Sequence, residues 1–385
     1  MSEAKKTDDA RNIKEREQKT VHPPNHISHS LLAVGTETAV FNERSSVRAR
    51  ILSYASAFKE AHIIVLCARG FSESRVGDSL FLHPTNSRFR FSRIFHAWKI
   101  GRAAPNVEIV TVQDPFETGL VGWIIARSRK ARLHVQVHTD FLSSAYRKLS
   151  ILNRARAFLA GFILRRASRV RVVSERIKNG IEGKYHLRAP ISVLPIFVDV
   201  KRFQNAKPDE LLVQRFSKFR TRILVVSRLE SEKNVSLAIR AFGKSAPDNA
   251  CLIIVGSGRE RKNLEQVAKN LGVLPRTFFE GSASPSRYYK LANILLAPSF
   301  YEGYGMTIVE ALASGIPVLS TDVGAAREAG AIVASKETFT EALARWFKNG
   351  PREGILKNYP YQDFNEYVQA YCDDIISCVS SKKRQ

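Results

Sequence analysis

Short apolar runs alternate with segments of helical spacing along most of this 385-residue chain. A short apolar run suits a strand that is buried on both faces, whereas apolar residues three and four positions apart suit a helix that covers it. In the first half, this pattern predicts strands at 30–34, 63–66, 107–112, 133–137, 170–173 and 191–194, and helices at 47–58, 119–128 and 149–166. Residues 71–90 break the pattern, and we expect a loop or a hairpin there.

The alternation starts again after a charged stretch at 201–218, which is expected to hold a linker and a helix. The second set predicts strands at 223–226, 251–255, 277–279, 294–297 and 317–320, and helices at 235–242, 259–271, 285–291, 306–314 and 364–379. Repeated strand–helix alternation gives parallel sheets with right-handed crossovers. Two such sets predict an α/β fold of two doubly wound, Rossmann-like domains that face each other across a cleft.

Length and composition agree with two domains, because 385 residues exceed one ordinary domain and 44% are hydrophobic. Residues 1–26 are polar and charged, and we expect a disordered or weakly ordered tail there. The expected domains are an N-terminal Rossmann-like domain at 27–200, a C-terminal one at 201–360, and a C-terminal helix and tail at 361–385.

Cysteine usage and the shortness of the apolar runs favour a cytoplasmic protein. Cys67, Cys251, Cys372 and Cys378 lack the spacing of a zinc site or a disulfide framework, which fits a reducing compartment. We expect no signal peptide, because the first residues are charged, and no membrane-spanning helix, because no apolar run reaches about 20 residues.

The net charge of +24 favours a polyanionic partner, such as nucleic acid, an anionic membrane surface or a phosphorylated substrate. Three basic clusters in the first half are interleaved with aromatic residues, which suits peripheral attachment to the inner face of a membrane and a lipid-linked acceptor. A basic enzyme without membrane contact is the alternative. The clusters are Arg88, Arg90, Arg93, Lys99 and Arg102; Arg127, Arg129, Lys130 and Arg132; and Arg147, Lys148, Arg154, Arg156, Arg165, Arg166, Arg169 and Arg171.

Two cations, Arg228 and Lys233, come after the strand predicted at 223–226. Open α/β sheets bind ligands at the carboxyl ends of their strands. A guanidinium forks onto phosphate oxygens and an ammonium adds a point charge, so the pair can neutralise a diphosphate. The alternative is a solvated loop in which the two cations pair with Glu230 and Glu232.

Residues 301–310 carry the most specific pattern. Glu302 lies in a loop after a strand, Gly303 and Gly305 allow that loop to turn tightly, and a helix is expected to begin near Met306. Free N–H groups and the positive end of the helix dipole suit a phosphate. Glu310 follows about one turn into the helix. One carboxylate can then accept bonds from sugar hydroxyls and the other from ribose hydroxyls; a helix cap with a surface glutamate is the alternative.

Weaker candidates stand at other strand ends. Gly256 allows positive φ and close backbone approach, but the third glycine of a dinucleotide fingerprint is missing, so we predict no NAD site. His138 can hydrogen-bond a sugar hydroxyl or a developing charge, although a lone histidine is more often structural. Gly35 is placed to close over phosphates or to hold an acceptor, and Arg176 and Lys178 line the same edge.

Taken in order, these motifs resemble the retaining glycosyltransferases of family 4, the group 1 glycosyltransferases with the GT-B fold. The resemblance rests on Ser-Arg-Leu-x-x-Glu-Lys-Asn at 227–234, Val-Gly-x-Gly at 255–258 and Glu-Gly-Tyr-Gly-Met-Thr-x-x-Glu-Ala at 302–311. Gln-Asp-Pro-Phe-Glu-Thr-Gly at 113–119 and His-Thr-Asp at 138–140 also match. The resemblance extends from about residue 28 to the end of the chain.

The resemblance implies a role for each matching position. Arg228 and Lys233 would bind the donor diphosphate, Glu302 the transferred sugar and Glu310 the ribose. His138, Glu302, Arg228 and Lys233 would be catalytic. The donor-binding set would be Gly35, Arg228, Lys233, Gly256, Gly281, Glu302, Gly305, Met306, Thr307 and Glu310. The resemblance also implies a nucleotide-diphosphate sugar as co-substrate, no metal or other cofactor, and a terminal helix that crosses back to the first domain.

The chain departs from the family pattern at two places. Gly35 is followed by Thr36, where many members have a second glycine. The segment 281–284, where the base usually binds, has no distinguishing residue, so the nucleotide base stays unnamed.

The expected reaction is retaining transfer to the hydroxyl of a carbohydrate, lipid-linked or polysaccharide acceptor, through an oxocarbenium-like transition state. We favour a front-face route, because no second carboxylate nucleophile is visible. The alternatives are a sugar-nucleotide epimerase of similar fold, a catalytically inactive relative, and a basic nucleic-acid-binding protein. No recognised nucleic-acid module supports the last of these.

Overall fold

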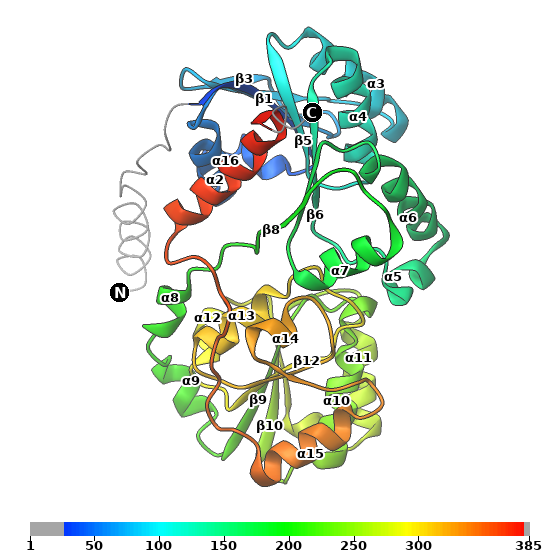
Figure 1. Cartoon of the computed structure of the whole chain (residues 1–385). Helices are drawn as coiled ribbons and strands as arrows, with labels where there is room; N and C mark the ends of the chain where they lie inside the picture. Colours follow the sequence, from blue (N-terminus) through cyan, green and yellow to red (C-terminus); the bar gives the residue numbers. More distant parts are fainter. Residues whose placement is uncertain (1–26, 381–385) are drawn as a thin grey trace.

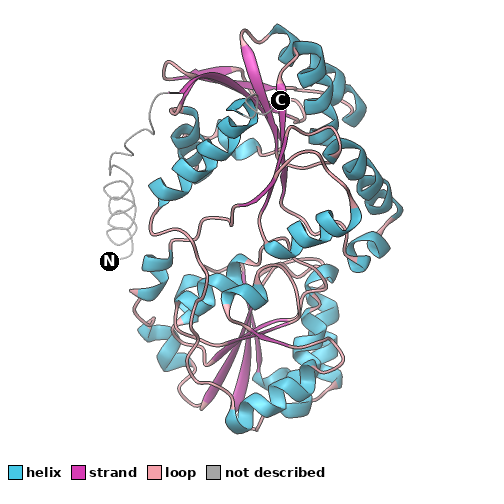
Figure 2. Cartoon of the chain, viewed as in Figure 1, coloured by secondary structure: helices cyan, strands magenta, loops and turns pink. Residues whose placement is uncertain are grey.

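The computed structural model describes residues 27–380, so the tail expected at 1–26 lies outside the described part of the chain. Figures 1 and 2 show two sheets, each with helices on both faces, one above the other. This arrangement confirms the predicted fold class of two Rossmann-like domains. The domain boundary expected at 200–201 falls between the last strand of the first sheet and the first strand of the second.

The first sheet has the strand order β3-β4-β2-β1-β5-β6-β7-β8. All of its strand pairs are parallel except β3–β4, so residues 71–90 contain the expected hairpin. Because parallel strands end at one edge, Gly35, Gln113 and His138 come together there. The strands are β1 (Ile27–Gly35), β2 (Phe58–Val65), β3 (Ser74–Val76), β4 (Leu80–Pro84), β5 (Val107–Val112), β6 (Arg132–Val137), β7 (Arg169–Val172) and β8 (Ile191–Val193).

The helices expected at 47–58, 119–128 and 149–166 correspond to α2, α4 and α6. Helix α6 begins two residues later than expected, because Ser150 is extended (φ −162°, ψ 159°) and caps it by accepting from the Asn153 N–H at 3.0 Å. The sequence pattern missed α3, α5 and α7. The helices are η1 (Thr38–Phe41), α2 (Ser46–Ala55), α3 (Arg90–Ala103), α4 (Glu117–Arg129), α5 (Ser144–Leu149), α6 (Ile151–Leu164) and α7 (Glu175–Lys184).

The second sheet has the order β11-β10-β9-β12-β13-β14, and all its strand pairs are parallel. Its strands are β9 (Thr221–Val226), β10 (Ala250–Val255), β11 (Thr277–Gly281), β12 (Ile294–Ala297), β13 (Val318–Ser320) and β14 (Ile332–Val333). Its helices are α8 (Val200–Gln204), α9 (Glu210–Arg215), η2 (Ser231–Lys233), α10 (Val235–Ser245), α11 (Arg261–Asn270), η3 (Leu274–Arg276), α12 (Ser286–Tyr289), α13 (Met306–Ala313), α14 (Ala326–Ala329) and α15 (Phe339–Asn349). The pattern had not indicated β14, α14 or α15.

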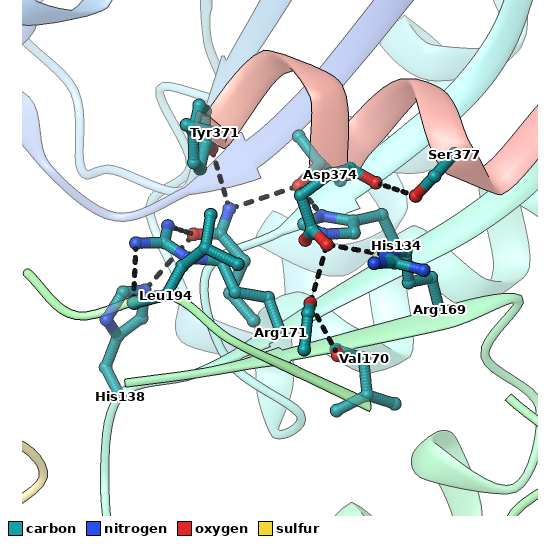
Figure 3. Close-up of polar contacts among 12 residues, drawn as sticks. His134, His138, Arg169, Val170, Arg171, Leu194, Tyr371, Asp374 and Ser377 are labelled. Carbon is teal, nitrogen blue, oxygen red and sulfur yellow. Dashed lines mark hydrogen bonds and ion pairs between the residues drawn. The ribbon is translucent and has the colours of Figure 1, made fainter. Parts of the chain in front are cut away.

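The terminal helix α16 (Phe364–Ser380) crosses back and packs on β5, β6, β7 and α2 of the first domain (Figure 1). Asp374 fixes it there (Figure 3). Its carboxylate lies 2.9 Å from His134 Nε2 and 2.5 Å from Arg169 Nε, and it accepts from the Ser192 hydroxyl at 2.6 Å. The side chain is 4% exposed, so this is a buried, fully partnered carboxylate.

The same helix corrects one prediction about the basic clusters. Arg171 was expected on a basic surface, but its side chain is 1% exposed and lies beneath α16 (Figure 3). Its guanidinium donates to Gln136 Oε1, the Leu194 carbonyl and the Tyr367 hydroxyl, and it lies 4.8 Å from the centre of the Tyr371 ring. Arg169 is likewise engaged by Asp374. Within the third cluster, therefore, only the members before residue 169 contribute to an exposed surface.

Candidate active site

A cavity of about 320 Å³ lies where the two sheets face each other. The second domain lines it with the ends of β9 and β12 and with residues 299–308, and the first domain contributes His138 and Ile196. Arg228, Lys233, Glu302, Gly305, Met306 and Thr307 all border this cavity. The structure thus brings together most of the residues that the sequence motifs singled out.

Lys233 and Glu302 form the polar centre of the cavity. The Lys233 ammonium lies 2.6 Å from Glu302 Oε1, and the Ser299 hydroxyl donates to the same oxygen at 2.8 Å. Both side chains are largely buried, at 15% and 20% exposure. A desolvated cation next to an open cavity can exchange its carboxylate partner for an incoming phosphate, since both are anions of similar hydrogen-bonding geometry.

Arg228 lies at the rim of the cavity. Its side chain is 70% exposed and donates to Glu232 Oε1 at 2.9 Å, as the alternative interpretation of this loop had expected. An exposed pair of this kind contributes little to stability, so the guanidinium is free to turn towards a ligand. Arg228 and Lys233 therefore combine an exposed charge at the rim with a largely buried charge inside.

The glycines at 256 and 258 position this basic loop. A Cβ on Gly256, whose φ is +140°, would lie 1.8 Å from the Ser227 carbonyl oxygen, and one on Gly258 would lie 2.2 Å from that of Leu229. The Leu229 N–H donates to the Ser257 carbonyl at 2.8 Å. The glycines thus allow one loop to pack on the backbone of the next. Neither residue lines the cavity, and Gly281 also lies outside it, where its carbonyl accepts from the Gly256 N–H at 2.8 Å.

The turn before α13 is also set by glycine. Gly305 has φ +89° and occupies the N-cap position without a side-chain cap. The N–H groups at the start of a helix have no partner within it, and those of Met306 and Thr307 begin this helix at the cavity wall. Gly303 makes the interdomain contact, because a Cβ there would lie 1.7 Å from the His138 carbonyl oxygen. Ser174 of the first domain donates to the Gly303 carbonyl at 3.1 Å.

Glu310 lies apart from Glu302. Its carboxylate accepts from the Tyr289 hydroxyl at 2.6 Å and does not border the cavity. Burial raises its pKa, while the Tyr289 bond and the charge of Arg202 act in the opposite direction. The two glutamates of the motif therefore occupy separate environments: one is paired with a cation in the cavity and the other is held by a phenol behind it.

His138 borders both this cavity and a second one in the first domain. Its Nε2 lies 3.2 Å from Gln136 Oε1. Burial lowers its pKa to about 3, and the charges of Arg171 and Arg50 contribute. The imidazole is therefore neutral near pH 7 and acts as a hydrogen-bonding group rather than as a cation.

The second cavity, of about 610 Å³, extends from His138 along the first sheet towards α16. Gly35 borders it at the end of β1, where a Cβ would lie 2.7 Å from the Gln113 side chain. Arg176 and Lys178 do not border it: Arg176 contacts Asp140 and Asp322, each at 3.3 Å, and Lys178 contacts Glu175 at 3.8 Å.

Three residues of these cavities had not been given a role in the site. Ser227 has a buried hydroxyl with no partner among the described residues, and the residue borders the same cavity as Lys233. Ser299 fixes Glu302, as described above. Arg171 borders the larger cavity from beneath α16. Ser227 directly follows β9, and Ser299 lies two residues after the end of β12, so their positions at strand ends were the available signal.

Residues 27–380 contain no group of three His, Cys, Asp or Glu side chains arranged to hold a metal ion. Within the same range, no helix combines the length and the apolar character needed to cross a bilayer.

Residues 206–363 match the family model for glycosyl transferases group 1, and residues 49–202 match that of glycosyltransferase family 4. The chain belongs to the group 1 glycosyltransferases. Among curated relatives, an alpha-monoglucosyldiacylglycerol synthase of Streptococcus pneumoniae is 26% identical over 263 residues, which are 64% of this chain and 58% of that relative. A probable sucrose-phosphate synthase of Oryza sativa is 24% identical over 243 residues, which cover 54% of this chain and 21% of that relative.

Solved structures of other glycosyltransferases share the whole architecture. A sucrose-phosphate synthase from Thermosynechococcus elongatus has a TM-score of 0.67 at 14% identity, with 92% of this chain and 94% of that one covered. Anabaena HepE in complex with UDP-glucose has a TM-score of 0.62 at 17% identity, with 91% and 97% covered. These likenesses support the GT-B arrangement of two α/β domains.

Proposed function

We propose that this chain transfers a sugar from a nucleotide-diphosphate sugar to an acceptor hydroxyl, with retention of configuration at the anomeric carbon. The observation that carries the proposal is the interdomain cavity in which Lys233, Glu302 and the start of α13 meet His138. A donor bound there would have its diphosphate on the second domain and its sugar facing the first.

The donor's charges match the groups at the cavity. Lys233 and Arg228 would neutralise the diphosphate, assisted by the N–H groups at the start of α13. Glu302, released from Lys233, would accept from hydroxyls of the sugar. Ser227 offers a further unpaired hydroxyl. The fold relative HepE was solved with UDP-glucose, which supports a nucleotide sugar as the donor class.

We propose a front-face mechanism without a divalent metal. The acceptor hydroxyl would approach the anomeric carbon from the side on which the diphosphate departs, and the leaving group would take up the acceptor proton. Stabilising a departing diphosphate is electrostatic work, which the two cations and the oriented N–H groups can perform. Neutral His138 would hydrogen-bond the sugar without adding a competing positive charge.

The acceptor would enter through the 610 Å³ cavity, which meets the donor cavity at His138. A carbohydrate, a lipid-linked sugar or a polysaccharide precursor would fit this route. The relative from Streptococcus pneumoniae is named for a glucosylated diacylglycerol, which favours an acceptor at a membrane surface. We accordingly propose peripheral attachment to the membrane.

Thermal-shift measurements with a panel of nucleotide sugars test the donor site. A ligand at 100 times its Kd stabilises the folded state by about 2.7 kcal/mol. Lys233→Ala and Glu302→Ala should keep the fold and lower transfer by more than about tenfold, or about 1.4 kcal/mol of transition-state stabilisation. Lys336→Ala and Glu337→Ala remove a pair on the surface of the same domain and serve as matched controls.

Near-normal transfer by both folded site variants would refute the site. Release of an isomerised nucleotide sugar in the absence of any acceptor would instead indicate the epimerase. Salt-sensitive RNA or DNA binding without any nucleotide-sugar binding would favour the nucleic-acid alternative.

A further inference from the structure

Helices α3, α4 and α6 pack side by side on one face of the first sheet (Figure 1). Each of these helices follows a strand of the sheet and leads to the next parallel strand. Its amino end therefore lies at the edge where the strands end, which is also the edge that faces the cleft. This helical layer therefore presents one continuous surface, whereas the 610 Å³ cavity is bordered by α2 and α16 and by no residue of α3, α4 or α6.

Large apolar side chains are exposed on this layer. Phe91 is 87% exposed, Phe158 84% and Ile151 77%. Phe91 and Phe95 lie four residues apart on α3, and Ile151 and Phe158 lie seven residues apart on α6, so each pair shares one helix face. Leu149 at the end of α5 and Leu152 at the start of α6 add further exposed apolar surface. Ordinary solvent-facing helix positions are polar, so this concentration marks an interaction surface.

A basic cavity of about 580 Å³ lies beside Phe158. Five cations border it, no acidic residue does, and none of the five makes an ion pair with any residue that the structure describes. The cations are Arg147, Arg154, Arg165, Arg166 and Lys184. Its floor is apolar: Gly161 allows the Tyr185 ring to approach, since a Cβ there would lie 3.0 Å from it.

The balance of charge extends over the whole layer. Residues 88–166 contain fifteen Lys and Arg but four Asp and Glu. One of those acids, Glu117, is already paired with Arg156 at 2.6 Å. A partner for this surface must be anionic and must also accept exposed phenylalanine, which is the chemistry of an anionic lipid bilayer.

We propose that the α3–α6 surface, defined by Phe91, Phe95, Ile151, Phe158 and the 580 Å³ cavity, docks on an anionic membrane. The cavity takes the phosphate of a lipid headgroup, and the exposed apolar side chains enter the interface. The inference rests on the peripheral attachment proposed above and names the surface and the lipid class that produce it.

Flotation with vesicles tests the docking without any transfer reaction. The wild-type protein should float with phosphatidylcholine vesicles that contain phosphatidylglycerol, at physiological salt, and not with phosphatidylcholine alone. Phe91→Ser/Phe158→Ser and Arg154→Gln/Arg165→Gln should each weaken binding by about tenfold or more. Leu211→Ser/Arg259→Gln removes an exposed leucine and an exposed arginine from the second domain, and this control should bind like the wild type.

A thermal shift with the nucleotide sugar, measured without vesicles, separates this proposal from the donor site. Both surface variants should keep the wild-type shift, which also shows that they are folded. Absence of wild-type binding to anionic vesicles, or binding to RNA in preference to them, would overturn the proposal. Equal vesicle binding by the wild type and both surface variants would overturn this surface while leaving peripheral attachment intact. Absence of a thermal shift with nucleotide sugars in the wild-type protein would count against the donor site alone.

Discussion

Asp374 holds α16 against the first sheet, and the substitution Asp374→Asn, which replaces a single non-hydrogen atom, tests this role. In Asp374→Asn, one side-chain oxygen becomes an NH₂ group and the negative charge is lost. The Asn side chain can still accept one bond, but its NH₂ then faces either the Arg169 or the His134 side of the network. The variant therefore leaves the Arg169 guanidinium without its buried counter-charge, and its NH₂ finds an acceptor at His134 only where Nε2 carries no proton.

The magnitude follows from the pKa of Asp374. Burial alone would raise it, but bonds from His134, Ser192 and Arg169 outweigh burial and lower the pKa from 3.8 to about 2. A difference of this size corresponds to about 2 kcal/mol of stability. Removing one partner of a buried ion pair costs about 3–5 kcal/mol. Because asparagine keeps one acceptor, we expect a loss of about 2–4 kcal/mol.

Urea unfolding at pH 7 measures this loss. Trp98 and Trp123 lie in the first domain and Trp346 in the second, so tryptophan fluorescence reports on both domains. Asp373→Asn is the matched control, because Asp373 is exposed and, among residues 27–380, its side chain bonds only Gln369 of its own helix. A loss for Asp374→Asn within about 0.5 kcal/mol of this control would refute the assigned role.

The sign of the pH dependence gives a second check. The folded pKa lies below the unfolded one, so the contribution is complete above about pH 3.8 and is lost as the pH falls towards 2. The difference between wild type and Asp374→Asn should thus be constant from pH 7 to about 5 and shrink below pH 4. A difference that does not change on acidification would contradict the ionised carboxylate.

Two further predictions concern the cleft. Gly303→Ala should lower transfer by about tenfold or more while each domain stays folded, because its Cβ would lie 1.7 Å from the His138 carbonyl oxygen. The control Gly183→Ala, where nothing lies within 4 Å of an added Cβ, should retain full activity. Equal initial rates of transfer for the two variants would contradict the contact. Because the pKa of His138 is lowered to about 3, its titration should not change the initial rate of transfer between pH 6 and 8. A change in rate centred near pH 6.5 that disappears in His138→Gln would be inconsistent with a neutral imidazole.

The sequence predicted the strands well because parallel strands buried on both faces read as continuous apolar runs. Strand β10, for example, is buried along its entire length. Helix α3 was missed because its amphipathic pattern is interrupted by arginines and exposed phenylalanines. The short helix α5 before Ser150 was also missed, since serine is tolerated inside helices and acts as a cap only where the chain turns. Both errors concern surfaces, where packing does not dictate residue type.

The site was predictable where the relevant contacts are local. Arg228 with Glu232, and Gly305 with the start of α13, lie within one motif. Long-range partners could not be read from spacing. Glu310 meets Tyr289 from α12, and Arg171 meets Tyr367 from a helix almost two hundred positions later. An arginine in a basic stretch reads as surface, and only the tertiary fold reveals that α16 covers it.

Lys233 and Glu302 come from motifs that lie 69 positions apart, yet they form one unit in the cavity. Removing either charge leaves the other largely buried and unpaired, so a single substitution measures more than one residue's contact with a ligand. When the ammonium turns to a phosphate, Glu302 loses its cation and gains accepting capacity for hydroxyls. Binding of the diphosphate would therefore prepare the carboxylate for the sugar. The sequence motifs assign Lys233 and Glu302 separate roles and do not indicate that the two are coupled. The coupling follows only from the 2.6 Å between the Lys233 ammonium and Glu302 Oε1.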